Sequence, residues 1–91
     1  MNNNVPDRWQ RFVDSFGLSK PGTNPWDAEE LDRQFQGASH GEKCIIKFLL
    51  NLWNAGYDWE CGEFDFFDAV ATWGESQLSA FRTWLDDPWW P

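Results

Sequence analysis

Residues 39–54, SHGEKCIIKFLLNLWN, decide the fold of this chain. Ser39 and Glu42 form an S-x-x-E pattern, which is typical of a capping box at the start of a helix. After the box, the polar residues lie four, four and three positions apart, at Lys43, Lys47, Asn51 and Asn54. They make one narrow stripe on a helix that is otherwise apolar on every side. Such a helix has to be surrounded by others, so we predict a central apolar helix over about 40–54.

Two shorter helices are predicted before this stretch. In residues 5–16, apolar residues recur at the spacing of one helix face, and Gly17 suits a left-handed helix stop. Residues 17–24 contain two glycines and a proline, which indicates an internal loop. Asn24 is a good N-cap and Pro25 is a good first residue, so we expect the second helix to begin there.

Two more helices are predicted after the central one, over about 63–73 and 75–86. In the first, Asp65, Asp68 and Thr72 are spaced three and four residues apart, so they share one face, which we expect to point outward. The opposite side is expected to be buried by Phe64, Phe67, Val70 and Ala71. In the second helix, the residues expected to be buried are Leu78, Phe81, Trp84 and Leu85.

The length of 91 residues fits one domain, and no segment shows the sustained alternation of a strand. We therefore predict an all-α fold, a single compact bundle of four or five short helices spanning residues 1–91. Pro88 ends the last helix, and the PWWP tail, residues 87–91, is predicted to pack back on the bundle. There Trp89 and Trp90 would plug the bundle, and the alternative is that they anchor a partner.

The segment DWECGEFDFFD, residues 58–68, concentrates carboxylates without a neighbouring base. Its acids are Asp58, Glu60, Glu63, Asp65 and Asp68. The net charge of the chain is −8, and residues 48–91 hold eight acids against one base, Arg82. Such a surface repels nucleic acid and attracts basic partners, although solubility of a tryptophan-rich chain is an alternative reason for the charge.

No catalytic or metal-binding motif stands out in the sequence. A calcium loop that starts at Asp58 fails, because Gly62 stands where the third oxygen ligand belongs. His40 and Cys44 are four residues apart, but Cys44 opens the apolar run and is expected to be a core thiol. The single histidine also leaves a zinc site short of ligands. We therefore expect no enzyme, no metal and no other cofactor, and we expect Cys44 and Cys61 to stay reduced.

The short chain, its charge of −8 and its acidic face resemble small inhibitors from phages and mobile elements, namely anti-CRISPR and anti-restriction DNA mimics. The acids that carry this resemblance are Asp58, Glu60, Glu63, Asp65, Asp68, Glu75, Asp86 and Asp87. The resemblance implies a non-enzymatic inhibitor that binds a nuclease or surveillance complex and blocks its DNA site. DNA carries one charge per roughly 1.7 Å of its axis, so dense carboxylates can occupy a site built for phosphates.

These observations predict a binding protein whose acidic face engages a basic protein surface, for which the resemblance names a CRISPR or restriction complex. The alternative is a small bacterial structural or regulatory interaction module that uses a tryptophan surface. The residues predicted to bind a partner are Asp58, Trp59, Glu60, Glu63, Asp65, Asp68, Glu75, Trp89 and Trp90. We expect neither direct nucleic-acid binding nor membrane insertion. We expect a cytoplasmic location, which is the host cytoplasm if a phage encodes the chain. Arg8 and Arg11 leave open whether the protein is a monomer or a homodimer.

Overall fold

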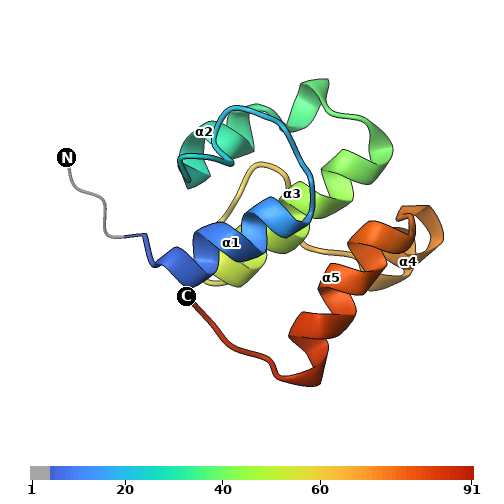
Figure 1. Ribbon diagram of the computed structural model, residues 1–91. Helices are drawn as coiled ribbons and strands as arrows, with labels where there is room; N and C mark the ends of the chain where they lie inside the picture. Colours follow the sequence, from blue (N-terminus) through green and yellow to red (C-terminus); the bar gives the residue numbers. More distant parts are fainter. Residues whose placement is uncertain (1–4) are drawn as a thin grey trace.

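The computed structural model describes residues 5–91, and the first four residues of the predicted domain lie outside this range. Its elements, in chain order, are α1 (Asp7–Ser15), α2 (Ala28–Arg33), the 3-10 helix η1 (Phe35–Gly37), α3 (His40–Trp53), α4 (Phe66–Thr72) and α5 (Glu75–Asp86) (Figure 1). Residues 5–91 contain no β-strand, and a single isolated bridge joins Thr23 and Trp26. The radius of gyration is 12.2 Å, close to the value of about 12 Å expected for a compact chain of this length. The predicted all-α bundle is confirmed.

Helix α3 is the centre of this bundle, as predicted. Its capping box is complete, because the Glu42 amide donates to Ser39 Oγ at 3.3 Å and the Ser39 amide donates to Glu42 Oε1 at 2.9 Å. Seven of its fourteen residues are buried: Cys44, Ile45, Ile46, Phe48, Leu49, Leu50 and Leu52. The ring of Phe48 lies 5.1–6.3 Å from six others, those of Phe12, Phe16, Phe64, Trp73, Phe81 and Trp84. Phe48 therefore joins α1, the segments that flank α4, and α5 in one core.

Helix α2 begins later than predicted. Asp27 is its N-cap and accepts a hydrogen bond from the Glu30 amide at 3.2 Å, whereas Asn24 and Pro25 lie in the preceding turn and are joined by a cis peptide bond. The physical reason for the later start is Trp26, which is buried and packs edge-on against Trp9 at 5.1 Å. The core thus holds this turn in place. The left-handed stop after α1 is confirmed, since Gly17 has φ of +71°.

Helix α4 is rotated relative to the prediction, which placed Phe67 and Val70 on its buried side. Phe67 is 82% exposed and Val70 is 41% exposed, while Ala69 is fully buried. The helix starts at Phe66, later than predicted, and its small residue Ala69 lies where α4 packs against α3. Ala69 allows a close approach that a phenylalanine would prevent. Of the face predicted to point outward, Asp65 and Thr72 are exposed, whereas Asp68 turns toward α3.

Helix α5 has the predicted bounds and is followed by a tail that returns to the bundle. Phe81 is buried, but Leu85 is 52% exposed although it was predicted to be buried, because the core below α5 is already filled by Phe81 and half-buried Trp84. In the tail, the Trp89 ring lies 6.2 Å from Trp9 and 4.0 Å from the guanidinium carbon of Arg8. Trp89 therefore covers the end of the core.

Replacing the central ring tests this arrangement. Phe48→Ala is expected to lower the free energy of unfolding by about 3–5 kcal/mol, because it removes a buried ring and leaves a cavity. The matched control is Phe67→Ala, whose ring is 82% exposed and whose loss should change stability by less than about 0.5 kcal/mol. Equilibrium denaturation in urea measures both variants. Losses of equal size would contradict the central place given to Phe48.

Candidate functional site

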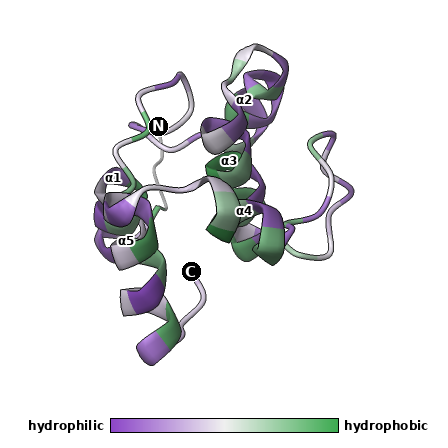
Figure 2. Ribbon diagram, turned by 90° about the vertical axis from the view of Figure 1, so that its right-hand side faces the viewer, coloured by the Kyte–Doolittle hydropathy of each residue, from purple (hydrophilic) through white to green (hydrophobic). Residues whose placement is uncertain are grey.

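The residues predicted to bind a partner do not share one face. Asp58, Glu60 and Glu63 are exposed on the loop between α3 and α4, which projects at the right-hand edge of Figure 2. Asp65 is engaged as the N-cap of α4. Glu75, at the start of α5, accepts a hydrogen bond from Arg82 at 2.7 Å. The continuous acidic face expected from the sequence is therefore divided among a loop, a helix cap and an ion pair.

The acidic loop is fixed to the helices by its backbone, which leaves its carboxylates at the surface. Asp32 of α2 accepts hydrogen bonds from the amides of Glu60 and Cys61, both at 3.0 Å. Asn51 of α3 donates to the Gly62 carbonyl at 3.0 Å. These hydrogen bonds attach the loop to α2 and α3. They also give partners to loop backbone groups that have none in a helix or strand.

Trp59, one of the residues predicted to bind a partner, is part of this attachment and packs inside the protein. Its ring is 7% exposed, and its indole nitrogen donates to the Asn54 carbonyl at 3.0 Å. The half-exposed neighbour Tyr57 packs on it with ring centroids 4.4 Å apart. A hollow of about 460 Å³ lies beside these rings, lined by Glu29, Asp32, Arg33, Tyr57, Trp59 and Glu60. Trp59 is buried because its ring packs where the loop crosses α2 and α3.

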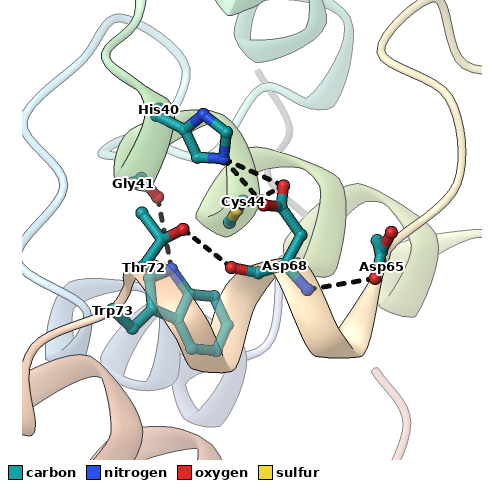
Figure 3. Close-up of polar contacts among 7 residues, drawn as sticks. All are labelled: His40, Gly41, Cys44, Asp65, Asp68, Thr72 and Trp73. Atoms are coloured by element: carbon teal, nitrogen blue, oxygen red, sulfur yellow. Dashed lines mark hydrogen bonds and ion pairs between the residues drawn. The ribbon is translucent and has the colours of Figure 1, made fainter.

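A second polar cluster forms where α4 meets the start of α3 (Figure 3). His40 Nε2 lies 2.8 Å from Asp68 Oδ1 and 3.0 Å from Oδ2, and the Cys44 thiol donates to Asp68 Oδ2 at 3.5 Å. Asp68 is itself held, since its amide donates to Asp65 Oδ1 at 3.1 Å and its carbonyl accepts from Thr72 Oγ1 at 2.7 Å. The three side chains thus meet on a backbone that the capped helix keeps in place.

The electrostatics of this cluster oppose activation of Cys44. The hydrogen bond from His40 lowers the pKa of Asp68 below its usual value. Burial, followed by the nearby negative charge of Asp68, raises the pKa of Cys44 to about 11. A nucleophilic cysteine needs a lowered pKa and a histidine that accepts the thiol proton, whereas here the thiol donates to a carboxylate. What the cluster does offer is three metal-ligand atoms of different types, all within 4.8 Å of one another.

Sequence reasoning missed this cluster because its third member is distant in the chain. His40 and Cys44 at i, i+4 predicted two side chains on one helix face, which was the available signal. Asp68 comes 24 residues after Cys44, and the expected outward register of α4 pointed it toward solvent.

Exposed apolar side chains form a third feature, over α4 and the end of α5. Phe67 is 82% exposed, Trp90 is 67% exposed, and Phe66 and Val70 are 45% and 41% exposed. Ring contacts of 5.6–6.2 Å connect Phe67 and Phe66 to Trp84 and Trp90 through Phe81, which is itself buried beneath them. We call Phe66, Phe67, Val70, Trp84 and Trp90 the aromatic surface. Sequence reasoning placed Phe67 and Val70 in the core, and it had Trp90 plug the bundle with Trp89, with a partner anchor as the alternative; the exposure of Trp90 contradicts the plug.

The described residues therefore offer an acidic loop, a His–Cys–Asp cluster and an aromatic surface. Across residues 5–91, every helix is too short or too polar to cross a bilayer. Comparison of the chain with protein-family models, curated proteins and solved structures found no match.

The two cysteines give a prediction that follows from their burial. The pKa values of about 11 for Cys44 and about 12 for Cys61 lie above the ordinary value of 9.0, so the folded chain keeps protons that the unfolded chain releases. The free energy of unfolding should therefore be insensitive to these thiols below about pH 8 and should fall as the pH rises from about 9 toward 11. Thiolate absorbance in folded and denatured protein measures the titration, and Cys44→Ala and Cys61→Ala assign it. A thiolate midpoint near 9 in the folded protein would contradict this result.

Proposed function

We propose that this chain is a binding protein that docks on a basic protein surface through its aromatic surface. The observation that carries the proposal is the exposure of Phe67, at 82%, and of Trp90, at 67%, in a chain whose other rings, apart from Tyr57 and Phe66, are buried or partly buried. Large contiguous apolar patches that are exposed on a folded protein mark interaction sites. Tryptophan and other aromatic residues are favoured at the centres of interfaces.

Magnitudes favour the rings over the carboxylates as the source of affinity. Covering the exposed parts of Phe66, Phe67, Val70 and Trp90 removes on the order of 400 Å² from water, which is worth roughly 10 kcal/mol before the costs of association. A solvent-exposed ion pair contributes only about 0–1 kcal/mol. The carboxylates would then act mainly on the rate of encounter and on the choice of partner.

The charge around the aromatic surface is what favours a basic partner. Glu63 and Asp65 precede α4, and Asp86 and Asp87 end α5, and all four are exposed. The one base in residues 48–91, Arg82, already bonds Glu75. A second copy placed symmetrically on this surface would oppose acids to acids, which argues against a symmetric homodimer there.

The resemblance to DNA mimics gives this proposal a finer form, in which the basic partner surface is the nucleic-acid site of a CRISPR or restriction complex. The exposed carboxylates of Asp58, Glu60 and Glu63 support it, because none of them forms an ion pair within residues 5–91. The engagement of Asp65 in a helix cap, of Asp68 with His40 and of Glu75 with Arg82 supports the coarser form, an interaction module that binds mainly through its rings.

The test is capture of a partner from bacterial lysate by the immobilised chain and by three variants. Phe67→Ala/Trp90→Ala should reduce the amount of the specific partner retained at least tenfold, because both rings lie at the surface and their loss leaves the fold intact. Tyr57→Ala removes a half-exposed ring beside the hollow at Trp59, outside the aromatic surface, and should still retain the partner. Asp58→Lys/Glu60→Lys/Glu63→Lys should weaken retention most at low salt. Full retention by the Phe67/Trp90 variant would overturn the proposal.

Competing duplex DNA separates the two forms of the proposal. If the partner is displaced by DNA and is lost as the salt concentration rises, its bound surface is a nucleic-acid site and the mimic form holds. If the partner stays bound in both conditions, the rings carry the interaction and the mimic form is wrong.

A further inference from the structure

We propose that His40, Cys44 and Asp68 form a binding site for one zinc-class divalent cation, which joins the start of α3 to α4. Nothing in the proposed partner surface requires this site, so each proposal can fail without the other. The carrying observation is geometric: a nitrogen, a sulfur and an oxygen ligand from two helices lie within 4.8 Å of one another (Figure 3).

The donor set fits zinc in type and number. Zinc is bound by histidine nitrogen, cysteine sulfur and carboxylate oxygen, and sites with three protein ligands keep the fourth position for water or another molecule. His40 and Cys44 are separated by four residues on α3, which puts both on one face of the helix. Asp68 approaches that face from α4 and already contacts both.

The two ligand pairs that include Asp68 are close to the distances of a zinc site. Zinc bond lengths of about 2.0–2.3 Å in tetrahedral geometry place ligand atoms about 3.3–3.6 Å apart. The contact from Cys44 Sγ to Asp68 Oδ2 is already 3.5 Å, while the contacts from His40 Nε2 to the carboxylate are 2.8 and 3.0 Å. Admitting the ion therefore means moving His40 and Asp68 apart by about 0.5 Å and bringing the His40 nitrogen, which lies within 4.8 Å of Cys44 Sγ, into the same range.

The side chains that have to move are the ones with room to do so. The His40 side chain is 63% exposed and that of Asp68 is 41% exposed, so a change of rotamer displaces water rather than core atoms. Cys44, in contrast, is 3% exposed and is fixed in the core of α3. One rigid sulfur with two adjustable ligands at the surface leaves the open coordination position directed toward solvent.

Proton and charge balance are simple at this site. The bound ion replaces the thiol proton, which leaves for water. It also replaces the Nε2 proton that His40 donates to the carboxylate, so His40 ligates as the neutral tautomer that carries its one proton on Nδ1. The thiolate and the Asp68 carboxylate together neutralise a charge of +2. The other charged groups that act on the cluster are Asp65, which favours a cation, and Lys47, which opposes it.

The consequence of binding would be a fixed position for α4. That helix has seven residues, too few to be stable without its contacts, and Ala69 is its one buried residue. A metal bridge between α3 and α4 would add a bond beside the buried contact of Ala69.

Cobalt(II) titration of chelator-treated protein tests the site, because a cobalt–thiolate bond gives a charge-transfer absorption and tetrahedral coordination gives intense visible bands. We expect one equivalent to produce both, and zinc to displace the cobalt. His40→Ala, Cys44→Ala and Asp68→Asn should each reduce affinity at least tenfold. The controls Cys61→Ala, which removes the other buried thiol, and Glu63→Gln, which removes an exposed acid, should bind as the parent does.

A second measurement is included because Cys44→Ala removes a core thiol and so changes the fold as well as the site. Zinc should raise the thermal midpoint of the parent protein and should not raise that of His40→Ala. The His40 side chain is exposed, so its removal leaves the fold in place. The proposal is overturned if no thiolate band appears, if the band is lost in Cys61→Ala in place of Cys44→Ala, or if His40→Ala is stabilised by zinc as much as the parent is.

Discussion

Burial of the Phe48 ring is the constraint on which the rest of this structure depends. Six rings from α1, α5 and the segments that flank α4 reach Phe48, and they do so because α3 is apolar on nearly every side. A chain of this size has little core to spare, and aromatic rings supply large buried areas from few residues. The short outer helices are stable because each contributes a ring or a small residue to this one cluster.

The same constraint explains why some rings are left at the surface. The positions around Phe48 are filled by Phe64 and Trp73, which lie before and after α4, so the helix between them contacts α3 through the small side chain of Ala69. Its phenylalanines then have no place inside and face water. The orientation of α4 therefore leaves its phenylalanines at the aromatic surface. The same orientation brings Asp68, on another side of the helix, to His40 and Cys44.

Local signals in the sequence predicted the parts of the fold that local physics determines. Ser39 and Glu42 marked the start of α3, and Gly17 marked the stop after α1, because caps and left-handed turns depend on a few adjacent residues. The register of α4 was wrong because period alone placed large rings inside, whereas packing selected the small residue Ala69. The meeting of Asp68 with His40, 28 residues apart, and the burial of Trp59 depend on tertiary contacts that periodicity does not contain.

The orientation of α4 is the central claim, since the aromatic surface and the His–Cys–Asp cluster both follow from it. Nuclear Overhauser contacts of the Ala69 methyl group and of the Phe67 ring, measured in labelled protein, test it most directly. The account predicts that Ala69 contacts residues of α3 and that Phe67 has no contact with the core beyond its neighbour Phe66. Contacts from the Phe67 ring to Ile45 or Phe48, with Ala69 in contact only with solvent, would contradict it.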